Sequence, residues 1–223
     1  MKKKILICDN LEIFYKNNKI IDNLSFSVDE RDFFLILGKN GVGKSTLMKE
    51  ILDLKNISSG EIKKNFKTCG YMSQEILLKK EFPSTICEFV LSSRAVYSKF
   101  FYTSKDREIV KENLKKLNLW DIKDKSISSL SIGQRQRVLL CRCLCISEKI
   151  IFLDEPTNSL DINIRKMLYD ILEKLNKEGL TIVMIIHDEE AFKYSNRALV
   201  LGKENKVIEN VLEKFEKGEI KFD

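Results

Sequence analysis

The sequence predicts an α/β fold with a mostly parallel sheet, an antiparallel β segment at its start and an inserted helical block. Three apolar runs, FFLIL (33–37), KIIFL (149–153) and TIVMII (181–186), lack polar alternation and are typical of strands buried on both faces. A helix-like segment at residues 162–178 separates the last two, and Gly179 follows it. The order strand, helix, strand implies right-handed crossovers and parallel pairing.

The composition indicates one compact domain. The chain has 223 residues, of which 43% are hydrophobic and 32% charged, enough for one core with an inserted subdomain. Its apolar runs fall far short of the roughly 20 residues that cross a bilayer. The opening MKKKILIC is followed by Asp9 and Asn10 and is too short for an export signal. We therefore expect a cytoplasmic protein.

The charge and the cysteines leave two alternatives open. A net charge of +6 favours anionic partners such as a nucleotide, a nucleic acid or the inner face of a membrane, but a solvated lysine-rich surface explains it as well. Without an export signal the six cysteines should be reduced thiols. In VLLCRCLCI, helical spacing puts only Cys141 and Cys145 on one face, so we favour small packing residues over a metal site.

The remaining elements follow from periodicity. LSFSV (24–28) alternates, and Asn17 and Asn18 between two apolar runs indicate a hairpin within residues 4–28. Residues 45 to about 54 are helix-like, and KTCGYMSQ (67–74) predicts a strand and then a loop. From 85 to about 129 the pattern is helical, with Val110, Leu114 and Leu117 on one stripe. We expect a single domain, 1–223, with residues 1–73 and 130–223 as the core with its β subdomain and 74–129 as a helical subdomain.

The stretch LGKNGVGKST predicts a phosphate-binding loop. Gly38, Gly43, Lys44 and Ser45 satisfy GxxxxGK[ST] between a buried strand and a helix, the context that a P-loop NTPase core requires. Glycines let successive N–H groups point inward at an anion, and the following helix adds its positive end. Lys44 would add a point charge for the β and γ phosphates, and Ser45 a hydroxyl for Mg²⁺. The alternative is a plain glycine-rich turn.

Acidic and imidazole side chains follow the other buried strands. Asp154 ends one strand, where its carboxylate could reach Mg²⁺, and Glu155 is the candidate to deprotonate an attacking water. His187, the only histidine, follows TIVMII at the same sheet edge, where ligands of open α/β sheets bind. The alternatives are two solvated acids and a histidine with a purely structural role.

Together, these segments resemble those of ABC-type ATPases, the nucleotide-binding subunits of transporters. GKNGVGKST resembles the Walker A loop, IIFLDEPT the Walker B strand and LSIGQRQRV (130–138) the signature loop of that family. NSLD (158–161) resembles its D-loop, Gln74 in MSQE its Q-loop residue and His187 its switch histidine. Tyr15 fits the aromatic residue that stacks on adenine, although core packing is the alternative.

The signature loop departs from the family pattern at one residue. The family usually has LSGGQ, and Ile132 replaces the first glycine of the pair. A β-branched residue disfavours positive φ and adds bulk beside a phosphate, so we expect a working signature with weakened closure on ATP. The helix that starts near Ser131 would point its N-terminus at the γ phosphate.

The resemblance implies a set of site residues. Catalytic roles fall to Glu155, His187, Gln74 and Lys44, and Mg²⁺ contacts to Ser45, Gln74 and Asp154. Nucleotide contacts fall to Tyr15, Gly38, Lys39, Asn40, Gly41, Val42, Gly43, Lys44, Ser45, Thr46, Gln74, Ser131, Gly133, Gln134, Asp154 and His187.

The resemblance also implies partners. Two copies of the chain would sandwich ATP, attach to an integral membrane permease at the inner face of the cell membrane and act indirectly with an extracytoplasmic metal-binding protein, without nucleic acid. The segment FPSTICEFVLSSR (82–94) resembles a stretch of zinc and manganese importers and, less closely, of siderophore or cobalamin importers. The other readings are an ABC ATPase acting on DNA or ribosomes, a P-loop kinase or a regulatory ATP-binding module.

Overall fold

A central sheet organises the chain in the computed structural model, which describes residues 2–15, 18–54, 59–73, 83–97, 101–158, 160–202 and 204–219. Within these ranges six strands line up in the order β5 (Gly70–Met72), β6 (Ile150–Asp154), β7 (Thr181–Ile185), β3 (Phe33–Leu37), β8 (Arg197–Val200) and β9 (Lys206–Glu209). All neighbours are parallel except β8 and β9. The predicted mostly parallel sheet is confirmed, and β9 adds an antiparallel edge.

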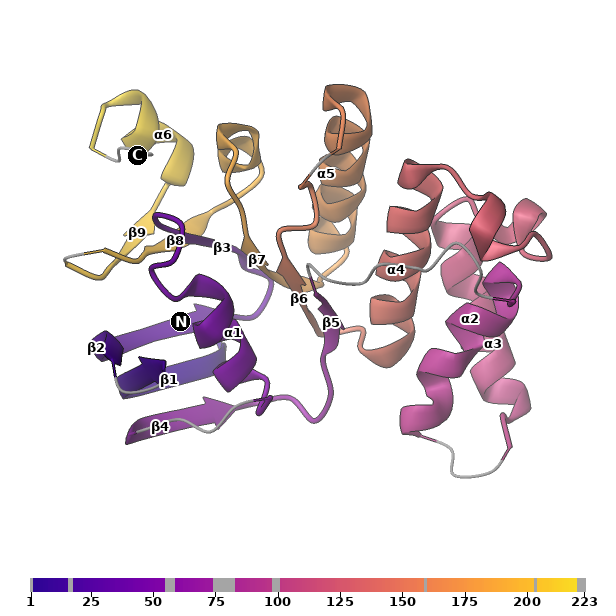
Figure 1. Cartoon of the computed structure of the whole chain (residues 1–223), viewed down its shortest axis with the longest axis horizontal. Coiled ribbons are helices and arrows are strands. Elements are labelled where there is room, and N and C mark those ends of the chain that lie inside the picture. Colours follow the sequence, from indigo (N-terminus) through magenta and orange to yellow (C-terminus); the bar gives the residue numbers. More distant parts are fainter. Residues whose placement is uncertain are drawn as a thin grey trace.

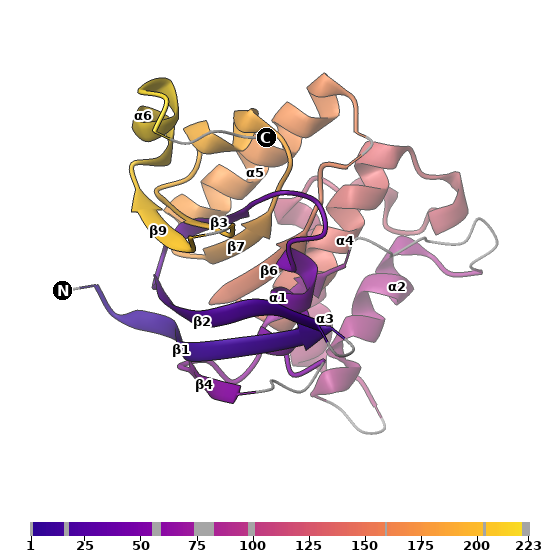
Figure 2. The same ribbon diagram turned by 60° about the vertical axis from the view of Figure 1, so that its left-hand side comes forward.

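A second, antiparallel sheet comes from the first part of the chain. Its order is β2 (Asn18–Asp29), β1 (Lys4–Tyr15) and β4 (Ser59–Lys64). The predicted hairpin is confirmed as the β1–β2 pair, and Leu24, Phe26 and Val28 point into the core as the alternation required. Asn17 of the predicted turn lies outside the described residues. Figure 2 shows this sheet below the central one, with α1 (Lys44–Ile51) between them.

The helices that follow α1 are α2 (Ile86–Ser92), α3 (Ser104–Lys116), α4 (Ile132–Ile146), α5 (Ile162–Lys177) and, near the end, α6 (Val211–Glu216). Helices α4, α5 and α6 cover the other face of the central sheet, and α2 and α3 pack against α4. Short 3₁₀ turns are η1 (Ser93–Val96), η2 (Trp120–Ile122), η3 (Ile127–Ser129) and η4 (Glu189–Lys193). Figure 1 shows α2 and α3 beside α4, at the end of the molecule away from the antiparallel sheet. Capping boxes at Thr85 and Thr103 define where α2 and α3 begin.

Alternation along the central strands divides the core in two. Phe33, Leu35 and Leu37 pack toward α4 and α5, whereas Phe34 and Ile36 pack toward α1 and the antiparallel sheet. Both sets are buried because helices lie on one face and a sheet with a helix on the other. This two-sided cover explains why the strand sequences carry no polar alternation.

The cysteines of α4 lie in the core. Cys141, Cys143 and Cys145 are each 2% exposed or less, and all three have free thiols. Burial raises the pKa of the Cys143 thiol to about 12. These residues act as small packing side chains of the helix, as the spacing indicated.

A buried carboxylate joins the two sheets just before β3, at the opposite end of that strand from the phosphate loop. Asp32, between β2 and β3, is 0% exposed. It accepts hydrogen bonds from the amide of Asp29 at 2.9 Å, from Asn196 Nδ2 at 2.8 Å and from Arg197 Nη1 at 2.7 Å. Asn196 and Arg197 stand at the start of β8, so this junction fixes the antiparallel sheet to the central one.

Replacing Asp32→Ala should therefore lower the free energy of unfolding by about 3 kcal/mol. The variant removes the nearer carboxylate of Arg197, which keeps only Asp29 at 3.3 Å on the same nitrogen, and the acceptor of Asn196 Nδ2. Urea unfolding of the full chain measures the change. Asp22→Ala is the matched control, because the Asp22 side chain is 69% exposed in its pair with Lys19 and should change stability by about 0 to 1 kcal/mol. Equal effects of the two variants would contradict the junction.

Candidate functional site

The loop between β3 and α1 has a backbone that glycine alone adopts easily. Gly38, Gly41 and Gly43 have φ values of 144°, 80° and 107°. A Cβ on Gly38 would lie 2.6 Å from the carbonyl oxygen of Leu201. Gly43 is the N-cap of α1, so the loop ends directly at a helix N-terminus. The sequence motif thus corresponds to a wrapped loop in front of a helix dipole.

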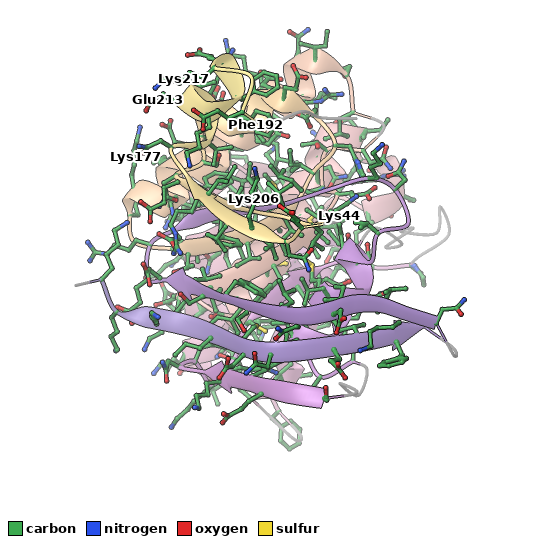
Figure 3. All side chains as sticks on the ribbon, turned by 90° about the vertical axis from the view of Figure 1, so that its left-hand side faces the viewer. Lys44, Lys177, Phe192, Lys206, Glu213 and Lys217 are labelled. Carbon is green, nitrogen blue, oxygen red and sulfur yellow. The ribbon has the colours of Figure 1, made fainter. Side chains whose placement is uncertain are left out.

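Lys44 lies beneath this loop. Its residue is 5% exposed, and its Nζ donates to the carbonyls of Gly38 at 2.6 Å and Lys39 at 3.0 Å. Burial lowers the pKa of the Lys44 ammonium, and the carboxylates of Glu155 and Asp154 oppose that shift. Figure 3 shows Lys44 near the middle of the molecule, far from Lys177 at the end of α5. The loop is therefore folded around a cation before it meets an anion.

Two hard oxygen ligands stand beside the loop. Ser45, in the first turn of α1, donates its hydroxyl to Asp154 Oδ1 at 3.0 Å. Asp154 is the last residue of β6 and is 2% exposed. Burial raises the pKa of the Asp154 carboxyl, and the hydrogen bond from Ser45 lowers it. A hydroxyl and a carboxylate in contact are the donor types that Mg²⁺ prefers.

Glu155 and His187 are in direct contact. His187 Nε2 and Glu155 Oε1 are 2.6 Å apart, although 32 positions separate them in the sequence. Glu155 follows β6 with φ 52°, its amide donates to the carbonyl of Ile185 at 3.1 Å, and Asn158 Nδ2 approaches its second oxygen at 3.3 Å. The positive φ turns the chain sharply after β6. Asp154 therefore contacts Ser45 and Glu155 contacts His187, at neighbouring points of the same sheet edge.

The signature loop is a capped helix start. Ser131 is the N-cap of α4, where the Gln134 amide donates to its hydroxyl at 3.3 Å and its own amide donates to Gln134 Oε1 at 3.0 Å. Gly133 is buried, and a Cβ there would lie 3.2 Å from Ile164 of α5. In the described part of the chain, no hydrogen bond joins residues 131–134 to residues 38–46. The structure thus brings together all the described catalytic candidates but leaves the signature loop apart.

The expected strain at Ile132 is wrong. Ile132 is the first residue of α4 and is not among the residues with positive φ, and its side chain is exposed. The family's glycine is therefore not needed for backbone conformation at this position. Our expectation assumed an irregular turn, whereas the residue begins a regular helix.

Several site residues complete the description. Lys39, Asn40 and Gly41 are exposed at the outer rim of the loop, while Val42 and Thr46 are half-buried. Gln74 and the side chain of Tyr15 lie outside the described residues.

Sequence reasoning missed four residues near the catalytic pair. Asn158 is a neighbour of Glu155, and Asp188, Thr157 and Tyr169 form hydrogen bonds behind the pair. The nearest signal was the position of Asp188 next to the only histidine.

Comparisons with known proteins identify the family of the chain. A family model described as ABC transporter matches residues 21–158. The chain therefore belongs to the ABC transporter family. Within that family it is an ATP-binding subunit and an ATPase, and it is similar to zinc and manganese import ATP-binding proteins.

Three relatives show the extent of the similarity. The manganese transport system ATP-binding protein MntB of Halalkalibacterium halodurans is 32% identical over 205 residues, which cover 88% of this chain and 82% of the relative. The zinc import ATP-binding protein ZnuC of Ehrlichia canis is 36% identical over 203 residues, 84% and 80% of the two chains. A solved metal-chelate type ABC transporter in an inward-facing conformation has a TM-score of 0.85 at 29% identity, covering 93% of this chain and 84% of that one.

None of the helices in the described ranges has the length and apolar character that a bilayer crossing needs.

Lys44→Ala should weaken ATP binding by roughly 10- to 100-fold, because each charge-assisted hydrogen bond contributes about 1.5 to 3 kcal/mol. Titration of the full chain with a fluorescent ATP analogue measures the affinity. Lys177→Ala is the control, since Lys177 is exposed and pairs with Glu173. Unchanged affinity in Lys44→Ala would remove this ammonium from the nucleotide site.

Ile132→Gly should preserve or raise the ATPase rate of the full chain, because the backbone of Ile132 is helical and glycine removes its side chain from the start of α4. Ile162→Gly makes the same change at the first residue of α5 and controls for the small helix propensity cost of glycine. A large loss confined to Ile132→Gly would show that its side chain contributes to turnover, and a large gain would show that it obstructs closure.

Proposed function

We propose that this chain hydrolyses ATP to power the import of a metal ion, zinc or manganese, through a separate membrane permease. The observation that carries the hydrolysis is the convergence of two side-chain pairs beside one glycine loop: Ser45 with Asp154, and Glu155 with His187. The cargo rests on the relatives, whose names specify manganese transport and zinc import.

The substrate end of the proposal is the loop at residues 38–46. Its amides and the N-terminus of α1 bind the triphosphate of ATP, and Lys44 places its charge against the β and γ phosphates. Lys39 to Thr46 line this contact, and Tyr15 stacks on the adenine. The lowered pKa of Lys44 reflects burial that a phosphate anion would offset, since it supplies the opposite charge.

The residues beside the loop fit a magnesium ion. The hydroxyl of Ser45 and the carboxylate of Asp154 are already in contact at 3.0 Å, so both can turn toward one hard cation. We assign Ser45, Asp154 and Gln74 to this ion. When bound, Mg²⁺ neutralises the charge that develops between the β and γ phosphates.

The proposed chemical step uses Glu155 as general base. A water oxygen forms a bond to the γ phosphorus, the bond from that phosphorus to the oxygen bridging the β phosphate breaks, and ADP leaves with the bridging electron pair. Glu155 takes the proton that the water loses. His187, at 2.6 Å from Glu155, holds the carboxylate in place and offers a polar contact to the γ phosphate.

The proposed active assembly contains two copies of the chain. In one chain the signature loop lies apart from the phosphate loop, so the Ser131, Gly133 and Gln134 segment of the second copy would complete the site. The amides of Ser131 and Gln134 are paired in the capping box. In this proposal the phosphate is therefore bound by the amides of Ile132 and Gly133, which lack an intrahelical acceptor at a helix start. A homodimer that sandwiches two ATP molecules follows.

We place this assembly on the inner face of the cell membrane, bound to integral permease subunits. Residues 74–129 form the helical subdomain that contacts the permease in this proposal, and 1–73 with 130–223 form the core. An extracytoplasmic metal-binding protein takes part indirectly, and nucleic acid does not. The Arg94 side chain, from the importer-like segment, is paired with Asp106 Oδ1 at 2.9 Å and helps hold η1 against α3.

A metal-chelate importer is the second candidate. The solved metal-chelate type transporter supports a metal-chelate cargo, and the segment at residues 82–94, which also resembles siderophore or cobalamin importers, supplies the candidate chelates. Both candidates use the same ATPase chemistry, so only a transport measurement separates them.

Glu155→Gln should reduce ATP hydrolysis by about 10²- to 10⁴-fold and leave ATP binding intact, since the amide cannot accept the proton. The trapped nucleotide should hold two copies together, visible as a dimer in size-exclusion chromatography.

In membrane vesicles that contain the chain together with its permease, the unmodified chain should drive ATP-dependent uptake of Zn²⁺ or Mn²⁺. Glu155→Gln should abolish this uptake.

The control is Glu173→Gln, because Glu173 lies on α5 and pairs with Lys177 rather than with a site residue. This variant should behave as the unmodified chain. Rapid turnover in Glu155→Gln would refute its role as base. Uptake of a siderophore or cobalamin in place of the free ions would move the cargo to the second candidate.

A further inference from the structure

A cluster of three polar side chains lies behind the catalytic pair. Thr157 follows Glu155 by two residues, Asp188 follows His187 directly, and Tyr169 is in the middle of α5. Asp188 Oδ2 accepts hydrogen bonds from the Tyr169 hydroxyl at 2.7 Å and from Thr157 Oγ1 at 3.1 Å. The two hydroxyls are themselves 3.4 Å apart. We call these three residues the Asp188 cluster.

Packing alone does not require the hydroxyls of this cluster. Tyr169 is 0% exposed, and its ring stacks on Tyr194 with centroids 5.2 Å apart, a contact that a phenylalanine would also make. Thr157 is 5% exposed. Burial raises the pKa of the Tyr169 hydroxyl, so it stays protonated and acts as a donor. Buried polar groups that satisfy one another in this way rigidify the structure around them.

Asp188 depends on these two donors. Its second oxygen, Oδ1, is buried and has no hydrogen-bond partner within the described residues. Removing either hydroxyl would leave the carboxylate less satisfied, and it would shift toward solvent or water. Because Asp188 and His187 are consecutive, such a shift moves the histidine as well.

We propose that the Asp188 cluster positions His187 against Glu155 by tying the loop after β6 and the loop after β7 to each other and to α5. The two loops are then linked twice, once through Glu155 and His187 and once beneath them through Thr157 and Asp188. Tyr169 adds the fixed point, since it comes from a helix rather than a loop. The inference rests on the proposed roles of Glu155 and His187 in hydrolysis.

The cluster residues are positioning residues, because none of them touches the reacting atoms. Their effect should therefore fall on turnover and not on ATP affinity. A misplacement of catalytic groups by about 1 Å can cost 10²-fold in rate, whereas the phosphate loop, which makes no hydrogen bond to the cluster in the described part of the chain, keeps its shape.

The decisive variant is Tyr169→Phe, which keeps the ring and removes the donor. In the full chain we expect kcat for ATP hydrolysis to fall by roughly 10- to 100-fold, with KM for ATP unchanged. Tyr194→Phe is the matched control: it removes a hydroxyl from the stacked neighbour, which donates to Asp170 outside the cluster, and should leave kcat unchanged.

A second pair of variants separates positioning from folding. Thr157→Val has nearly the same shape without the hydroxyl and should lower kcat, and Thr157→Ser should restore most of it. Thermal unfolding of each variant identifies any that fails to fold, in which case the other position carries the test.

Three outcomes would overturn the inference: unmodified kcat in both Tyr169→Phe and Thr157→Val, equal losses in Tyr169→Phe and Tyr194→Phe, or an increased KM without a change in kcat. Glu155→Gln distinguishes this failure from that of the proposed function. If Glu155→Gln is inactive and Tyr169→Phe is fully active, only the positioning role fails, whereas an active Glu155→Gln removes the proposed catalytic pair itself.

Discussion

The buried charge of Lys44 is the constraint that shapes the site. An ammonium taken from water must find acceptors, and it finds the carbonyls of Gly38 and Lys39 in its own loop. The chain can fold back over its own lysine only where glycines accept positive φ, as they do at 38, 41 and 43. The same wrapping leads the chain directly into the N-terminus of α1 at Gly43, where the helix dipole favours an anion. The anion-binding loop is thus organised by the lysine that completes it.

The central sheet delivers the remaining groups to that loop. Parallel strands end on one edge, so residues that follow β3, β6 and β7 meet there even though 109 positions separate Ser45 from Asp154. Because helices cover one face of the sheet and the antiparallel sheet with α1 covers the other, the strands are apolar throughout. Charged side chains can therefore stand only at the strand ends. The result is a polar edge on an apolar sheet, where Asp154 is buried enough for its pKa to rise and Glu155 turns away with φ 52°.

The sequence predicted correctly those elements that depend on neighbouring residues alone. The runs FFLIL and TIVMII, the hairpin within residues 4–28 and the helix start at Ser131 all follow from periodicity, turn residues or capping, which act over a few positions. The contact of His187 with Glu155 was predicted only as a shared sheet edge, because its distance depends on two loop conformations. The Asp188 cluster was missed, since Tyr169 is indistinguishable from any apolar stripe residue until α5 is placed on the sheet.

The error at Ile132 and the position of Gly133 have one explanation. The paired glycines of the family suggest a flexible turn, yet only the second of them is constrained here, by Ile164 of α5 rather than by φ. The same helix contacts the signature loop through Ile164 and the loop that carries His187 through Tyr169, about 1.4 turns apart. A rigid helix cannot shift at one of these points without shifting at the other. One helix, α5, therefore supports both the signature loop and the loop that carries His187, by packing at one point and through a hydroxyl at the other.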